Sequence, residues 1–83
     1  MDTSYAPGFS ESAFDSMRPG SSAEEVRGIL GAPLYVQRLG DGSEDWHYTR
    51  DGKCKWGDFA WLGRWVTVTN GRVSHIEKRV IYN

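Results

Sequence analysis

Residues 19–33, PGSSAEEVRGILGAP, carry the start and stop signals of one short helix. Ser22 can cap this helix, and Glu25, three residues later, can close a capping box back to the Ser22 amide. Gly31 can adopt the left-handed conformation that ends a helix, and the proline two residues later prevents its continuation. The stretch therefore predicts a helix over residues 22–30.

The apolar residues of this helix recur at helical spacing, so they share the face that we expect to be buried. They are Ala23, Val26, Ile29 and Leu30. A second, shorter helix is predicted before it, from residue 9 or 10 to Met17. The inner face of that helix carries Ala13, Phe14 and Met17.

After Pro33 the hydrophobic pattern changes to the period of a strand. Strands are predicted over residues 34–39, 44–49, 64–69 and 72–79. Alternation along the second of these places Trp46 and Tyr48 on one face of a sheet and His47 on the other. The Asn70-Gly71 pair is the strongest hairpin turn of the chain, and it joins the last two strands.

This order of elements predicts an α+β fold, in which two N-terminal helices pack on one face of a three- or four-stranded antiparallel sheet as a two-layer sandwich. The expected core is formed by Val26, Ile29, Leu30, Trp46, Tyr48, Val66 and Val68. The opposite face of the sheet is half-polar and free for contact, and it carries His47, Thr49, Trp65, Thr67 and Thr69. Residues 1–8 are expected to form a flexible arm, and residues 9–83 a single domain.

The composition narrows the classes of function. The chain has 83 residues, a formal net charge of −1 and 13% aromatic residues. This net charge argues against binding of nucleic acid through a basic face. No apolar stretch approaches the roughly 18 residues that a transmembrane helix needs.

The sequence offers no recognisable catalytic or metal-binding pattern. His47 and His75 do not stand at metal-ligand spacing from a second ligand, so we interpret both as exposed strand residues. Cys54 is the single cysteine. We interpret it as an ordinary thiol, with intermolecular pairing and a catalytic thiol as the alternatives. We therefore predict that the protein is not an enzyme and has no catalytic residues, no metal and no cofactor.

Residues 55–63, KWGDFAWLG, combine aromatic side chains with Gly57 and Gly63, which we expect to interrupt any strand. One interpretation is that the rings cover the open end of a small core. The other is a partly exposed apolar surface that binds a partner. On this second interpretation the partner-binding residues are Trp56, Phe59, Trp61 and Arg64.

Three features of the chain resemble the SmpA/OmlA (BamE-like) family of small bacterial envelope lipoproteins. They are the order Gly, Ser, acidic pair, Val, Leu-Gly and Pro over residues 20–33, the Trp-His-Tyr of residues 46–48, and the hairpin around Asn70-Gly71. The resemblance covers roughly residues 14–76. Ser21 stands where many members have Met, and the secretory signal and lipid-bearing cysteine of family members are not seen in this sequence.

The resemblance implies a non-catalytic binding or scaffold module of the bacterial cell envelope that supports outer-membrane assembly or maintenance. Its partner would be an envelope protein, with lipid head groups as a second class of contact. We expect a location on the periplasmic face of the outer membrane after removal of a leader, with the cytoplasm as the alternative. A different function class is a small protein inhibitor of an enzyme, because the plan is also similar to that of β-lactamase inhibitory proteins.

Overall fold

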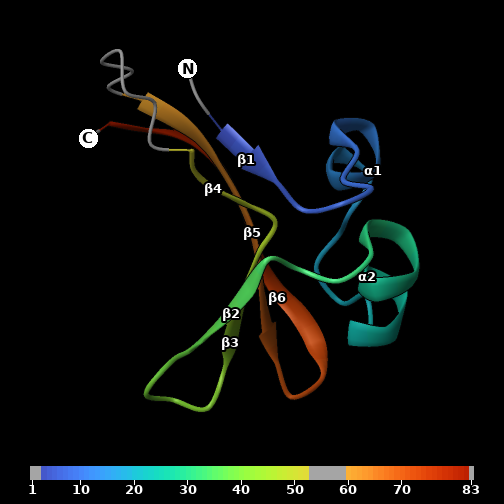
Figure 1. Cartoon of the computed structure of the whole chain (residues 1–83). Helices are drawn as coiled ribbons and strands as arrows, with labels where there is room; N and C mark the ends of the chain where they lie inside the picture. The colour runs from blue at the N-terminus through green and yellow to red at the C-terminus, as the bar shows by residue number, and fades with distance from the viewer. Residues whose placement is uncertain (1–2, 53–59, 83) are drawn as a thin grey trace.

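The computed structural model of the chain describes residues 3–52 and 60–82. The elements follow in the order β1 (Thr3–Tyr5), α1 (Glu11–Asp15), α2 (Ala23–Leu30), β2 (Tyr35–Arg38), β3 (Glu44–His47), β4 (Thr49–Asp51), β5 (Ala60–Thr69) and β6 (Arg72–Tyr82) (Figure 1). The predicted α+β class is confirmed.

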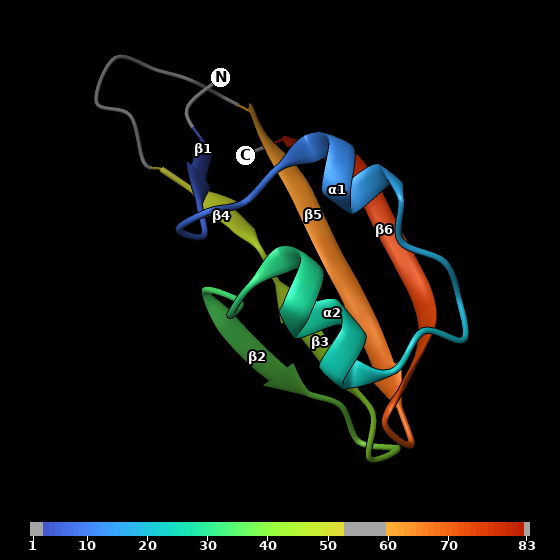
Figure 2. The same cartoon turned by 90° about the vertical axis from the view of Figure 1, so that its right-hand side faces the viewer.

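The strands form two antiparallel sheets. The larger sheet has the order β2-β3-β5-β6, and the smaller pairs β1 with β4. Tyr48, between β3 and β4, donates its backbone N–H to Arg64 O at 2.9 Å, so β5 stays bonded to the chain where the two sheets meet. Both helices lie on the same side of the four-stranded sheet (Figures 1 and 2).

The helix signals of residues 22–31 are confirmed. Ser22 Oγ accepts a hydrogen bond from Glu25 N at 3.1 Å, and Ser22 N donates to Glu25 Oε1 at 3.5 Å, which completes the capping box. Gly31 follows the helix with a φ of 79°, where a side chain would be strained. The earlier helix, α1, is shorter than predicted, but Phe14 and Met17 are buried as expected.

The hairpin of β5 and β6 is longer than its sequence pattern predicts. Both turn residues have positive φ, 53° at Asn70 and 76° at Gly71, as a type I′ turn requires. The pairing of the two strands extends as far as Ala60 on β5 and Tyr82 on β6. Gly63 therefore lies inside a strand, and the prediction that it interrupts one is wrong.

The N-terminal segment is partly structured, in contrast to the flexible arm expected over residues 1–8. Thr3–Tyr5 form β1 and pair with β4. Ala6 N donates to Tyr48 O at 2.9 Å, and Ala6 is buried. A three-residue strand has too few positions to show a period of two, so only the tertiary pairing reveals it.

Side chains from both helices and from three strands make up the core. Its members include Phe14, Met17, Val26, Leu30, Trp46, Tyr48, Val66, Val68 and Val73. Tyr48 Oη donates to Gly31 O at 3.0 Å, which ties the end of α2 to the strands. Burial raises the pKa of Tyr48 to about 12, so this donor stays protonated.

Ile29 is 48% exposed, so its predicted place in the core is wrong. At about 100° per residue, Ala23, Val26 and Leu30 share an arc of about 60°, and Ile29 lies about 90° from its centre. A two-turn helix that packs against a sheet buries a narrow stripe, and Ile29 is left at the flank of that stripe.

Candidate functional site

The four predicted partner-binding residues lie in different environments or outside the described part of the chain. Trp56 and Phe59 lie outside the described residues, as does Cys54. Trp61 is part of β5 and is partly buried. Arg64, three residues further along the same strand, is buried.

Arg64 is an interior residue that joins α1 to β5. Its Nε donates to Glu11 Oε1 at 2.8 Å, and its Nη1 donates to Gly63 O at 2.7 Å. Its side chain is 8% exposed, against 41% for Glu11. We therefore leave Arg64 out of the candidate contact surface, because its charge is already paired inside the fold.

The side of the sheet turned away from the helices is called the open face here. Trp46 on β3 and Val66 on β5 are buried in the core, so the residues that alternate with them along these strands lie on the open face. Residues of β2 and β6 that stand opposite those residues lie on the same face. The open face includes Tyr35, His47, Trp61, Trp65, Thr67, Glu77 and Arg79. The predicted inward and outward residues of residues 46–48 and 65–68 thus have the expected phase. The prediction that Thr49 lies on this face is wrong, because Thr49 belongs to β4 and is buried, and its Oγ1 accepts a hydrogen bond from Arg64 N at 2.9 Å.

One residue from each of the four strands falls on a line across the open face. Tyr35 is opposite His47, His47 is opposite Trp65, and Trp65 is opposite Glu77. The Tyr35 and His47 rings are stacked, with centroids 4.4 Å apart and planes at 6°. The His47 and Trp65 centroids are 5.1 Å apart, and the Arg79 guanidinium lies 4.8 Å from the Trp65 ring centroid. We call the three rings of Tyr35, His47 and Trp65, together with the Arg79 guanidinium beside Trp65, the ring row.

Gly63 is what allows the Trp65 ring to lie against the sheet. A Cβ at Gly63 would stand 2.8 Å from Trp65 Cζ3 and 2.8 Å from Ile81 Cδ1. Both distances are shorter than real carbon contacts, so the ring and the Ile81 side chain occupy the space that a larger residue would fill. Aromatic cover of a strand glycine is a known way to stabilise a position of poor strand propensity.

We predict that Gly63→Ala lowers the free energy of unfolding by about 1–3 kcal/mol, because the added methyl must push the Trp65 ring outward. Denaturant unfolding measures the loss, and the near-ultraviolet circular dichroism of the tryptophans reports the moved ring. Gly40→Ala is the matched control, since a Cβ at Gly40 meets no atom within 4 Å. Equal effects of the two substitutions would contradict the close packing over Gly63.

Polar contacts fix the neighbours of the ring row. Thr67 Oγ1 donates to Asp45 Oδ1 at 2.6 Å, between β5 and β3. Arg79 Nε lies 3.1 Å from Glu77 Oε1, and His75 Nε2 lies 2.9 Å from Glu77 Oε2. Glu77 thus holds Arg79 beside the Trp65 ring while its own charge is balanced.

His47 is only 7% exposed, so the expectation of an exposed strand residue is wrong for it. The side chain of His75 is 61% exposed, as expected. Neither ring nitrogen of His47 has a hydrogen-bond partner among the described residues. Burial lowers the pKa of His47 below 6.5, and the nearby charge of Asp45 opposes this shift. The ring in the middle of the row is therefore neutral at pH 7.

The lowered pKa of His47 predicts a loss of stability in mild acid. Between the folded pKa and 6.5 the unfolded chain binds more protons than the folded chain, so the free energy of unfolding falls as the pH drops below 6.5. Above that value the contribution of His47 no longer changes with pH. We expect the free energy of unfolding of the wild type to fall relative to that of His47→Phe as the pH falls from about 7.5 to about 5.5. A difference that is independent of pH would show that the folded pKa of His47 is not lowered.

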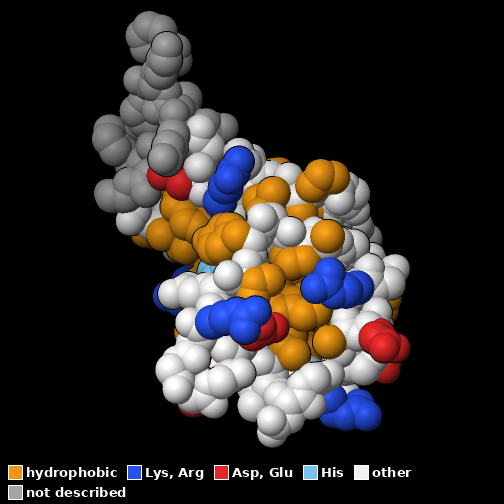
Figure 3. All heavy atoms as spheres, turned by 60° about the horizontal axis from the view of Figure 1, so that its bottom comes forward, with side chains coloured by type: hydrophobic (Ala, Val, Ile, Leu, Met, Phe, Trp, Pro, Cys, Tyr) orange, Lys and Arg blue, Asp and Glu red, His pale blue; other side chains and the backbone are white. Residues whose placement is uncertain are grey.

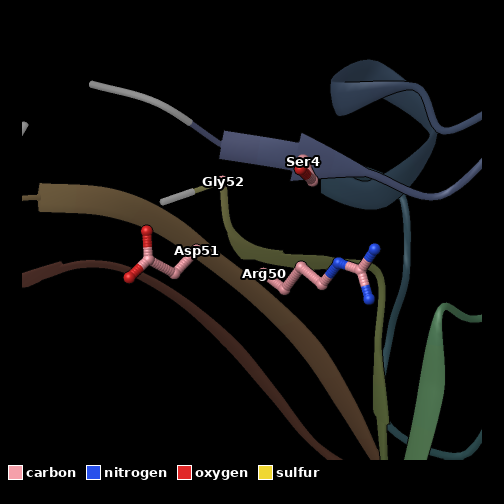
Figure 4. Close-up of a pocket in the computed structure, with 4 residues that line it drawn as sticks. All are labelled: Ser4, Arg50, Asp51 and Gly52. Carbon is pink, nitrogen blue, oxygen red and sulfur yellow. The ribbon is translucent and has the colours of Figure 1, made fainter. Parts of the chain in front are cut away.

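A second feature lies at the other end of the molecule, beside β1 and β4. A cavity of about 320 Å³ is lined by Ser4, Arg50, Asp51 and Gly52. Figure 4 shows the Arg50 and Asp51 side chains pointing in opposite directions along β4, so they do not converge on one point. Residues 3–52 and 60–82 contain no group of three or more His, Cys, Asp or Glu that could hold a metal ion.

The ring row was only partly predictable from the sequence. Alternation places His47 and Trp65 on the same face, but it does not say which residues stand opposite each other. Tyr35, Glu77 and Arg79 were therefore missed as site residues. The signal that finds them is the pairing register, which depends on the turn at residues 39–43 and on the Asn70-Gly71 turn.

Two further observations bear on the class of protein. None of the helices in the described part of the chain is long and apolar enough to cross a membrane. Comparison of the chain with protein-family models, with curated proteins and with solved structures finds no match.

Proposed function

We propose that this chain is a non-catalytic binding module, a two-layer sandwich whose helices close one face of the sheet while the open face contacts a partner. The observation that carries the proposal is the ring row. It brings Tyr35, Trp65 and Arg79, the three residue types most enriched at binding hot spots, together on a surface that neither of the two described helices covers.

The arrangement favours binding for a physical reason. Tyr35 remains 42% exposed and the Arg79 side chain 57%, so a partner can still remove water from both. Their neighbours His47 and Glu77 already hold them in place. Because these two side chains are already restricted, they lose little conformational entropy when a partner docks on them, and the entropic cost of binding is lower.

The compartment and partner class come from the resemblance to the SmpA/OmlA family. On that basis the partner is a protein of the outer-membrane assembly or maintenance machinery, with lipid head groups as a second class of contact. The site of action would be the periplasmic face of the outer membrane. Trp61, on the same face of β5 as Trp65, extends the contact surface, and Trp56 and Phe59 remain predicted members of it.

Capture from bacterial envelope extracts tests the proposal. Tyr35→Ser should reduce recovery of the partner at least ~10-fold, as expected for a hot-spot residue, with unchanged circular dichroism. Tyr82→Ser is the control, because Tyr82 is 77% exposed and stands on the helix side of β6. Recovery of cytosolic proteins alone, or equal loss with both variants, would contradict the proposal.

The second candidate, inhibition of an enzyme, uses the same face. The plan of two helices and a sheet is similar to that of β-lactamase inhibitory proteins, which bind through aromatic-rich sheet surfaces. The capture experiment separates the two functions by what is recovered. An enzyme whose activity falls on addition of the wild-type chain, but not of Tyr35→Ser, would favour the inhibitor.

A further inference from the structure

The two edges of the four-stranded sheet, β2 and β6, are protected to different degrees. Near the start of β6, Val73 N donates to Ser21 O at 2.8 Å, so an adjoining segment covers that part of the edge. The remainder carries charged side chains, Lys78 and Arg79 among them, which discourage pairing with another chain. Within the part of the chain that the structure describes, β2 has β3 as its one neighbour, and all four of its residues are exposed.

The free edge of β2 has a defined set of unpaired backbone groups. Leu39 N donates to Ser43 O at 2.9 Å at the end of the β2–β3 hairpin. Hydrogen-bonded positions alternate along an antiparallel pair, so Gln37 and Tyr35 direct their N–H and C=O groups toward β3. Val36 and Arg38 consequently direct theirs outward, where another strand could bond them.

Two of the four side chains of this exposed strand are large and hydrophobic. Val36 is 38% exposed and Tyr35 42%, and Arg38 is the one charged residue of the strand. On the face of the molecule drawn in Figure 3, hydrophobic side chains are exposed between basic ones, so apolar surface remains outside the core. An exposed apolar edge strand of this kind is a template for strand pairing.

We propose that β2 pairs antiparallel with β2 of a second copy of this chain, so that two four-stranded sheets join into one. The pairing that buries the most apolar surface places Val36 opposite Val36 of the second copy, and there the outward backbone groups of both residues bond each other. Tyr35 then stands opposite Gln37 of the second copy, on the open face.

The charges of β2 are compatible with a second copy of the chain in this register. Arg38 falls opposite Leu34 of the second copy, so the two guanidinium groups do not face each other. A shift that places Arg38 opposite itself would bring like charges together at the position where they destabilise a sheet most. The dimer also places the open faces of both copies on the same side of the joined sheet. The pairing of the two strands does not depend on the proposed function.

Analytical ultracentrifugation of the full chain over a wide range of concentration tests this pairing. The wild type should form a dimer in a concentration-dependent manner. Val36→Lys places two ammonium groups opposite each other, and it should raise the dissociation constant of the dimer at least ~10-fold. Val80→Lys is the matched control, since Val80 is 39% exposed and stands on the same side of the other edge strand. It should leave the dimer intact.

Hydrogen exchange of the wild type gives a readout that does not depend on how a variant folds. The amide of Val36 should become protected as the protein concentration rises, while the amides of Tyr35 and Gln37 are protected at every concentration. A chain that stays monomeric, a dimer lost through Val80→Lys rather than Val36→Lys, or a Val36 amide that exchanges freely in the dimer would each overturn the proposal.

Discussion

Trp46→Ala is expected to lower the free energy of unfolding by about 3–5 kcal/mol, the usual cost of removing a large buried ring. Trp46 is 4% exposed, its Nε1 donates to Glu44 Oε1 at 3.1 Å, and the Arg27 guanidinium lies 4.6 Å from its ring centroid. The substitution therefore removes core packing between β3 and α2. Urea unfolding of wild type and variant gives the difference directly.

Tyr82→Ala is the control for ring removal, because Tyr82 is 77% exposed and should change stability by no more than about 0.5 kcal/mol. Domains of this size are stable by only about 5–15 kcal/mol, so Trp46→Ala can leave a large fraction unfolded at growth temperature. A loss below about 1 kcal/mol would mean that Trp46 is not a core residue and that the phase of β3 is reversed.

Glu11→Ala is the second substitution with a large expected effect. It leaves the Arg64 guanidinium buried without its counter-charge, and the partners that remain to it among the described residues are the carbonyl oxygens of Gly63 and Arg79. Loss of one member of a fully buried ion pair costs about 3–5 kcal/mol, but Glu11 is 41% exposed and water can replace it in part. We therefore expect a loss of about 1–3 kcal/mol in denaturant unfolding.

Two comparisons separate burial of the Arg64 charge from a general weakening of α1. Asp15→Ala removes a carboxylate from the same helix, but its partner Lys78 is solvent-exposed, so the effect should be clearly smaller. Glu11→Met combined with Arg64→Met should be less destabilising than the sum of the single substitutions. Strict additivity would show that the two side chains do not interact in the folded chain.

Local signals in the sequence predicted a large part of the fold. The capping box of Ser22 and Glu25, the positive φ of Gly31 and the Asn70-Gly71 turn depend on neighbouring residues alone, and each occurs as predicted. The inward phase of Trp46 and Tyr48 also follows from alternation within one strand.

Features that depend on contacts between distant segments were not predictable in the same way. The pairing of Thr3–Tyr5 with β4 has no pattern of its own, and Gly63 is tolerated in β5 only because Trp65 and Ile81 cover it. The same limit applies to the candidate site. His47 seemed exposed from its polar character, yet Tyr35 and Trp65 enclose it once the strands are in register.

The central claim, that the open face contacts the partner, is tested most directly at two adjacent residues of β6. Arg79 lies on the open face and Val80 on the side of the helices, and their neighbours on β5 are Gly63 and Leu62. A photo-crosslinking amino acid placed at either position reports what binds there in envelope extracts. The account predicts cross-links to a partner protein from position 79 and none from position 80. Cross-links from position 80 alone, or from neither position, would contradict it.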